Sequence, residues 1–154
     1  MKIKDIMNSN VIVCKPDDTI SNAAQMLKMH NISGLPVVEN GILVGIVSEM
    51  DLLKLLEMPE HGGLWLPSPF EVIEVSIREL ISWEETKRML ADVGADPVRK
   101  IMKTNVYVTS SEDSVEDASV LMIKHKINRL PVVDNGTLVG IVTRGDIIRG
   151  LAEA

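Results

Sequence analysis

The chain has 154 residues, 45% of them hydrophobic and 25% charged, which suits one compact domain or two small subdomains that share a core. The net charge of −6 argues against nucleic-acid binding, which needs a basic face. No apolar run approaches the roughly 18–20 residues of a transmembrane helix, and the N-terminus lacks the apolar core of a secretory signal. These features predict a cytoplasmic protein without a membrane partner.

Two stretches of the chain are near copies of one another. Ser33–Asp51 reads SGLPVVENGILVGIVSEMD and Asn128–Asp146 reads NRLPVVDNGTLVGIVTRGD, with a constant offset of 95 residues. A duplicated unit in so short a chain indicates a pseudo-symmetric pair that buries a shared surface. We therefore expect repeats at 1–56 and 98–154, separated by an insertion at 57–97.

Each repeat is expected to run strand, helix, strand, strand, helix. The β-branched runs Val11–Val13 and Val106–Val108 predict the two first strands. Thr19 and Ser114 then stand at the N-cap position of an apolar helix period, because their hydroxyls can accept a hydrogen bond from the first turn. Both repeats should therefore begin in the same way.

A β-hairpin follows in each repeat. Asn40-Gly41 and Asn135-Gly136 separate two apolar runs, and this dipeptide favours a type I′ turn, which needs positive φ at both central residues. Gly45 and Gly140 interrupt the return strands, which predicts a bulge or the close approach of another segment. The near-continuous apolar strands indicate burial on both faces, by helices on one side and by the other repeat on the second.

The insertion at 57–97 holds both tryptophans and the only phenylalanine. The segment FEVIEVSI at 70–77 fits a strand or a helix, whereas Ser82-Trp83-Glu84-Glu85 is a capping box that predicts a helix closed by Gly94. The aromatic side chains either cover the pair of repeats or form a dimer or partner surface.

Three side chains admit a chemical role beside a structural one. The single cysteine, Cys14, excludes an internal disulfide and is either a reactive thiol or a plain strand residue. His30 and His125 are either ligands or residues that suit the C-terminal end of a helix through its dipole. The structural role is the expectation for all three.

Both repeats open on Ile-Met and carry the pattern h-P-V-V-[DE]-x-G-x-L-V-G-I-V-[ST]-x-x-D. In this pattern the chain resembles the cystathionine-β-synthase-type (CBS) domain pair, over nearly all of its length except the insertion. The resemblance implies an α/β (α+β) fold in which two β-α-β-β-α repeats pack about a pseudo-twofold axis and leave two clefts. It also implies a regulatory module, commonly a homodimer, that binds AMP, ADP, ATP or S-adenosylmethionine and acts on a protein partner that the sequence does not identify.

The resemblance assigns ribose binding to the [ST]-x-x-D motifs. Ser48 with Asp51, and Thr143 with Asp146, match the pairs that hold ribose hydroxyls in the family. A carboxylate can accept hydrogen bonds from two vicinal hydroxyls. The same spacing at a strand-to-helix junction is also an N-capping arrangement, and the two roles are compatible.

The cations of the second repeat are the candidates for binding a phosphate. Arg129 stands where related pairs place a phosphate-contacting arginine, and the first repeat has Gly34 there. Arg144 and Lys103 are further candidates, so a phosphate is expected to draw on the second repeat. The adenine is expected beside the first strands and the hairpin prolines, where Tyr107 either stacks on the base or belongs to the core. The residues are Val13, Cys14, Leu35, Pro36, Tyr107, Val108, Thr109, Leu130 and Pro131.

An enzymatic function finds little support. The sequence contains no P-loop, G-x-G-x-x-G, H-E-x-x-H or Cys/His cluster. We therefore expect no catalysis, no metal and no catalytic cofactor, with an adenine nucleotide or S-adenosylmethionine as the bound ligand. The alternative is a protein- or nucleic-acid-interaction scaffold with empty clefts, which the aromatic insertion would serve.

Overall fold

The computed structural model describes residues 1–56 and 83–154. The expectations for the segment 70–77 and for the aromatic residues before Trp83 lie outside the described residues. The elements in chain order are η1 (Ile3–Asp5), α1 (Ile20–Met29), β1 (Gly34–Glu39), β2 (Ile42–Ser48), α2 (Glu49–Leu56), α4 (Trp83–Ala95), η3 (Val98–Lys100), α5 (Val115–His125), β3 (Arg129–Asp134), β4 (Thr137–Thr143) and α6 (Arg144–Glu153).

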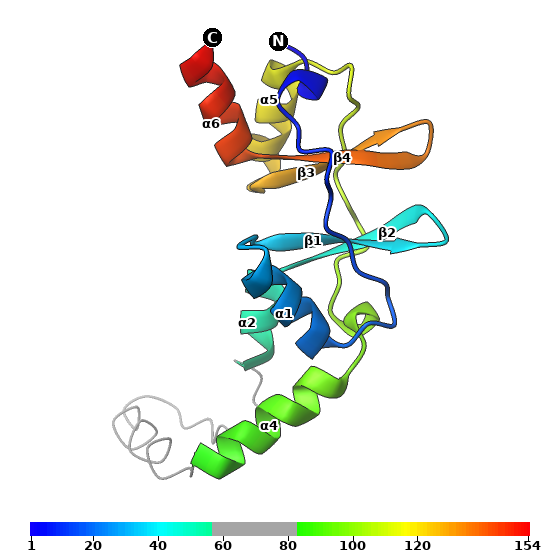
Figure 1. Ribbon diagram of the computed structural model, residues 1–154, viewed down its shortest axis with the longest axis vertical. Helices are drawn as coiled ribbons and strands as arrows, with labels where there is room; N and C mark the ends of the chain where they lie inside the picture. The colour runs from blue at the N-terminus through cyan, green and yellow to red at the C-terminus, as the bar shows by residue number, and fades with distance from the viewer. Residues whose placement is uncertain (57–82) are drawn as a thin grey trace.

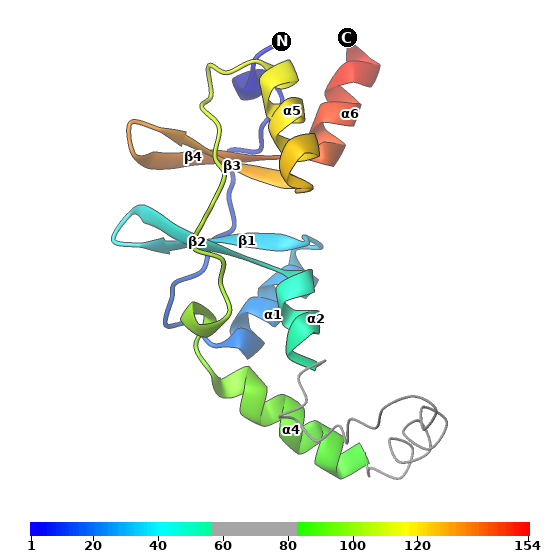
Figure 2. The same cartoon turned by 180° about the vertical axis from the view of Figure 1, so that it is seen from behind.

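The elements form layers along the long axis of the molecule (Figure 1). The antiparallel pairs β1-β2 and β3-β4 lie next to each other in the middle. Helices α1 and α2 lie on the outer side of the first pair, and α5 and α6 on the outer side of the second, as the opposite view also shows (Figure 2). This order of helices, sheet, sheet and helices is the pseudo-symmetric pair that the duplicated sequence predicts.

The predicted turns and helix caps are confirmed. Asn40 and Gly41 have φ of 51° and 79°, and Asn135 and Gly136 have the same values, as a type I′ turn requires. The Thr19 hydroxyl accepts a hydrogen bond from the backbone of Asn22, and the corresponding serine of α5 does the same. The local sequence therefore sets the same supersecondary unit twice.

The two predicted first strands are wrong. Residues 11–13 and 106–108 are not in strands, and the pairing is reduced to single parallel bridges between Cys14 and Val37 and between Thr109 and Val132. Each bridge is made by two backbone hydrogen bonds, of which the one from the Val38 N–H to the Cys14 carbonyl measures 2.9 Å. Each opening segment therefore pairs with its sheet at a single residue, and the β-branched runs at 11–13 and 106–108 do not add a strand to either sheet.

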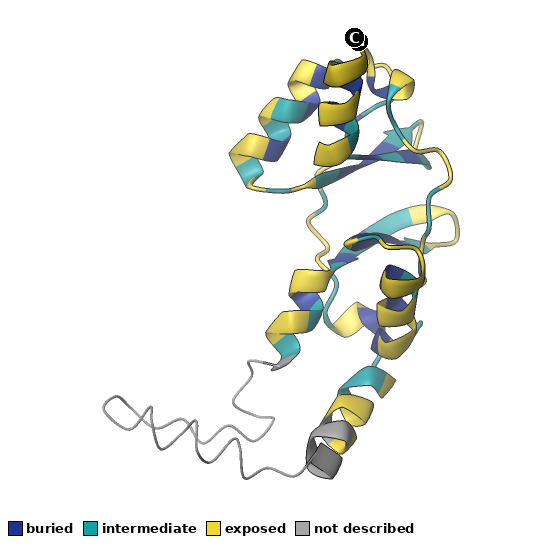
Figure 3. Ribbon diagram, turned by 60° about the vertical axis from the view of Figure 1, so that its left-hand side comes forward, coloured by how far each residue is buried: buried dark blue, intermediate teal, exposed yellow. Residues whose placement is uncertain are grey.

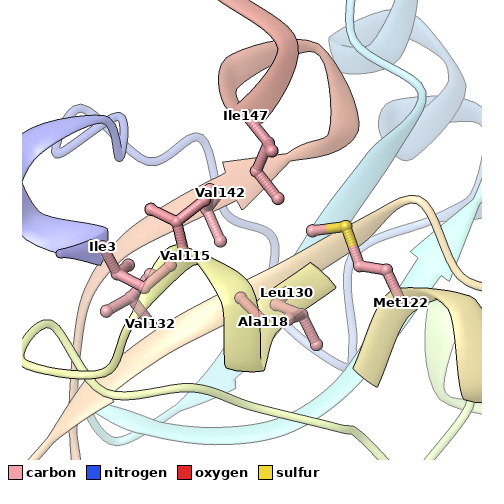
Figure 4. Packing of buried hydrophobic residues seen from close by; sticks show 8 residues of the cluster. All are labelled: Ile3, Val115, Ala118, Met122, Leu130, Val132, Val142 and Ile147. Atoms are coloured by element: carbon pink, nitrogen blue, oxygen red, sulfur yellow. The ribbon is translucent and has the colours of Figure 1, made fainter. Parts of the chain in front are cut away.

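The two repeats exchange their opening segments. Ile3 is fully buried in the core of the second repeat with Val115, Leu130 and Val142 (Figure 4), whereas Val98 is buried in the core of the first. Backbone bridges continue the exchange, because residue 8 pairs with β4 and residue 103 pairs with β2. Each packed half therefore contains the opening segment of the other sequence repeat.

The glycines in the return strands make room for these exchanged segments. A Cβ at Gly45 would lie 2.7 Å from the Met102 sulfur, and one at Gly140 would lie 2.7 Å from the Met7 sulfur. The strand register also shifts beside each glycine, between Val37 and Val38 in the first pair. Both parts of the expectation, a bulge and a close approach, are confirmed.

Helix α4 lies where the capping box predicts a helix and packs against α1, whereas the predicted cap, Ser82, lies outside the described residues. Gly94 lies in its last turn rather than beyond its end, and a Cβ there would be 3.2 Å from the Ser21 Cβ. This glycine therefore lets the two helices approach closely. Within residues 1–56 and 83–154, none of the helices has the length and apolar character needed to cross a membrane.

Candidate functional site

The two [ST]-x-x-D motifs form the same arrangement at the starts of α2 and α6. Asp146 Oδ2 accepts hydrogen bonds from the backbone N–H of Thr143 at 2.8 Å and from its hydroxyl at 2.9 Å. Asp51 Oδ2 accepts the same two bonds from Ser48, at 2.8 and 3.0 Å. One carboxylate oxygen therefore fixes the helix start, which is the capping role that the spacing predicts.

The second carboxylate oxygen of each aspartate faces a cation. Asp51 Oδ1 lies 3.6 Å from Lys103 Nζ, and Asp146 Oδ1 pairs with Arg149. Both carboxyl groups are largely buried, whereas the two cations are more than half exposed. Because each cation is more than half exposed, it can turn into the solvent and leave the carboxylate oxygen to a ligand hydroxyl.

A cleft of about 1000 Å³ lies between the two repeats. Thr143, Arg144 and Asp146 line it from the end of β4 and the start of α6. Because the opening segments are exchanged, its opposite wall comes from the first repeat, with Asn8 and residues 10–12, and Arg129 closes one side. We call this the larger cleft.

A second cleft of about 210 Å³ is built from the equivalent elements of the other half. Ser48, Asp51 and Lys103 line it, together with Tyr107 and His125. The rings of Tyr107 and His125 stack at a centroid distance of 3.7 Å and an angle of 18°. We call this the smaller cleft, and its stacked rings and ion pair narrow the space that a ligand would use.

Arg129 lies between the two clefts. Its side chain crosses Gly34, where a Cβ would be 2.6 Å from Arg129 Nε, and its guanidinium donates a hydrogen bond of 2.5 Å to the Ser33 hydroxyl. The pKa of Arg129 is lowered, because the effect of burial exceeds the opposite effect of the negative charges of Glu49 and Asp51. Because Gly34 has no side chain, the Arg129 side chain can occupy the space beside it.

The predicted site residues are distributed between the two clefts and the interior of the two halves. Lys103 and Tyr107 face the Asp51 motif rather than the Asp146 motif, so the cations of the second repeat do not gather in one place. Arg144 lies in the larger cleft, and Arg129 lines both. Eight predicted adenine-contacting residues line neither of these clefts: Val13, Cys14, Leu35, Pro36, Val108, Thr109, Leu130 and Pro131.

Most of these eight residues are buried beneath the clefts. Leu35 and Leu130 are fully buried and belong to the two hydrophobic cores, with the adjacent prolines beside them. Cys14 is also buried, and burial raises the pKa of its thiol to about 11, so it has the character of an inert core residue. They support the walls of the clefts rather than form them.

Sequence reasoning missed the asparagines of the opening segments. Asn10 and Val11 line the larger cleft, and Asn105 and Val106 line the smaller one. The Asn-Val dipeptide occurs at both positions with the repeat spacing, and this signal could have identified them. His125 was also missed as a cleft residue, although it ends α5 as expected. Among residues 1–56 and 83–154, no group of three His, Cys, Asp or Glu side chains is arranged to hold a metal ion.

Residues 3–58 and 98–153 both match the CBS domain family, so the chain belongs to this family. An uncharacterized protein of Methanocaldococcus jannaschii, MJ1426, is 40% identical over 98% of this chain and 91% of its own length. The structure of CBSX2 from Arabidopsis thaliana in complex with AMP has a TM-score of 0.71 at 29% identity, and covers 99% of this chain and 96% of that chain. The CBS domain pair of protein MJ0100, in complex with 5′-methylthioadenosine and S-adenosyl-L-methionine, has a TM-score of 0.73 at 27% identity, with 99% and 97% covered.

Proposed function

We propose that this protein is a cytoplasmic regulatory module, without catalytic activity, that binds an adenosyl ligand in the larger cleft. The observation that carries the proposal is the combination of a buried carboxylate at Asp146 with the guanidinium groups of Arg129 and Arg144 around one cleft. A carboxylate suits ribose hydroxyls, and guanidinium groups suit a phosphate or a carboxylate.

The sizes of the two clefts support the choice of the larger one. Binding pockets for small molecules have volumes of about 300–1,000 Å³, and about 1000 Å³ lies within that range whereas about 210 Å³ lies below it. The smaller cleft therefore has to separate its stacked Tyr107 and His125 rings before it can hold an adenosyl ligand.

The regulatory step follows from the position of the larger cleft between the two repeats. A ligand there contacts the start of α6 from one half and the opening segment from the other, so it favours one packing of the halves over others. A protein partner that distinguishes these packings would respond to the ligand. The relatives whose structures hold AMP or S-adenosyl-L-methionine support the ligand class.

Isothermal titration with AMP, ADP, ATP and S-adenosylmethionine tests the proposal, with GMP as the control for the base. At least one adenosyl ligand should bind and GMP should bind more weakly. Absorbance at 260 nm and mass spectrometry of the purified protein should reveal any nucleotide already bound. If no adenosyl ligand binds and no nucleotide is found, the scaffold with empty clefts is the better description.

We also propose that the protein forms a homodimer through the outer helices. Four aliphatic residues of helices α5 and α6 are each more than 60% exposed: Val120, Ile123, Ile148 and Leu151. Figure 3 colours much of the ribbon of the helices near the C-terminus as exposed. Exposed apolar side chains grouped on one face favour association. Sedimentation of the wild type and of Ile123→Glu tests this, and a monomeric wild type would refute it.

A further inference from the structure

Among the described residues, Arg129 is the only one that lines both clefts. Glu49 lines the larger cleft and Asp51 lines the smaller one, and both carboxylates act electrostatically on the Arg129 guanidinium. The Arg129 guanidinium is therefore within electrostatic reach of one acidic group in each cleft.

The Arg129 guanidinium donates its hydrogen bond to a neutral group. In the part of the chain that the structure describes, its side chain donates a hydrogen bond to the neutral Ser33 hydroxyl, and no carboxylate oxygen lies within 4.0 Å of it. Charge-assisted hydrogen bonds to a phosphate are about twice as strong as bonds between neutral groups. A phosphate in either cleft would therefore draw the guanidinium away from Ser33.

In this structure one arginine fills the space beside position 34, which is the pseudo-symmetric equivalent of position 129. A Cβ on Gly34 would lie 2.6 Å from Arg129 Nε, so a side chain there would displace the Arg129 side chain. Position 34 therefore supplies no second guanidinium, and Arg129 is the cation that the two clefts share, whereas Arg144 lines the larger cleft and Lys103 the smaller one.

We infer that the two clefts compete for Arg129, so that a phosphorylated adenosyl ligand in the larger cleft lowers the affinity of the smaller cleft for a second one. The inference rests on the proposed function and adds negative coupling between its two candidate sites. The coupling acts through the phosphate, so adenosine should not show it. Coupling between two sites typically changes affinity by about 5–150-fold.

Tyr107 provides a reporter for the smaller cleft because it is the only tyrosine of the chain. In protein labelled with ¹³C-tyrosine, its ring signals should shift when a ligand enters that cleft. AMP is titrated into the wild type and into Asp146→Ala, which lacks the carboxylate of the larger cleft. We expect the AMP concentration at half-shift to be about five- to tenfold lower in Asp146→Ala, because Arg129 is then available to the smaller cleft.

Three controls separate this coupling from other effects. Asp146→Asn keeps an oxygen that can cap α6, and it should change the midpoint in the same direction if Asp146→Ala does not fold. Adenosine should give equal midpoints in the wild type and in Asp146→Ala. In proteins that also carry Arg129→Gln, removal of the Asp146 carboxylate should leave the AMP midpoint unchanged.

The competition is overturned if the AMP midpoint does not fall in either Asp146 variant, or if it falls equally in the Arg129→Gln background. It is also overturned if neither AMP nor adenosine moves the Tyr107 signals while calorimetry shows binding to the larger cleft, and the proposed function then stands. If calorimetry shows no binding of any adenosyl ligand, the proposed function fails together with the competition.

Discussion

The two clefts are built from equivalent residues of a duplicated sequence, yet they differ about fivefold in volume, about 1000 against 210 Å³. Lys103 in the smaller cleft stands where the first repeat has Asn8, and Tyr107 stands where it has Ile12. The longer side chains pair with Asp51 and His125 respectively and fill the smaller cleft. The duplication therefore preserves the elements that build each cleft, whereas a few substitutions determine how much volume the cleft has.

The exchange of opening segments gives each cleft its own supporting residue, because the segment that lines each cleft is held by a different buried side chain. Ile3 holds the segment that lines the larger cleft, and Val98 holds the segment that lines the smaller one. A change at one anchor should therefore affect one cleft more than the other, and the following predictions use this difference.

The largest effect is expected for Ile3→Ala. Ile3 is fully buried in the core of the second half, and truncation of a buried isoleucine to alanine costs about 2–5 kcal/mol. The free energy of unfolding, measured in urea, should fall by about 3 kcal/mol, and AMP binding to the larger cleft should weaken. Ile42→Ala, at a side chain that is 60% exposed and lies outside the proposed dimer surface, is the control and should change stability by less than about 0.5 kcal/mol. Equal losses in the two variants would contradict the exchange of segments.

The next effect concerns the two aspartates. Asp146→Ala removes the charge-assisted hydrogen bonds that the proposal assigns to the ribose of AMP, and such bonds each contribute about 1.5–3 kcal/mol. AMP should therefore bind roughly 100-fold more weakly, as measured by calorimetry. Asp51→Ala makes the same change in the smaller cleft and should alter the tightest AMP affinity by less than about threefold. If Asp51→Ala causes the larger loss, the smaller cleft is the primary site.

A smaller effect is expected for Gly34→Ala. The added Cβ would lie 2.6 Å from Arg129 Nε and should displace the guanidinium from its place between the clefts. AMP binding should weaken about five- to tenfold, or roughly 1 kcal/mol, with adenosine binding unchanged. Equal losses for AMP and adenosine would show that Arg129 does not contact the phosphate.

The smallest effect is expected for Cys14→Thr, which places the residue of the second half into the first. Thr109, at the equivalent position, donates a hydrogen bond of 2.9 Å to Asp113, and Asp18 is the equivalent carboxylate near Cys14. The variant should retain its stability at pH 7 to within about 1 kcal/mol.

The pH dependence of Cys14→Thr provides a second measurement. The pKa of the Cys14 thiol rises from 9.0 to about 11 on folding, so the unfolded chain loses this proton first as the pH rises. The wild type should lose about 1 kcal/mol of stability from this group between about pH 8 and pH 10, and the variant should not. An identical pH dependence in both proteins would contradict the burial of this thiol.

The sequence alone determined the features that depend on neighbouring residues. The Asn-Gly turns, the helix caps and the [ST]-x-x-D motifs each act within a few residues, and each appears in the structure where it was predicted. The first strands were wrong for the same reason, because β-branched residues favour extended backbone without supplying a partner strand. Whether a ladder forms depends on a segment elsewhere in the chain.

Only the tertiary structure determined which of these motifs line the same cleft. Lys103 and Asp146 belong to the same sequence repeat but lie in different clefts, because the opening segments are exchanged between the halves. Gly34 and Arg129 are equivalent in sequence, yet one provides the space that the other fills. Such relations join residues far apart in the sequence, 95 positions in the case of Gly34 and Arg129, and steric fit in three dimensions determines them rather than any local pattern.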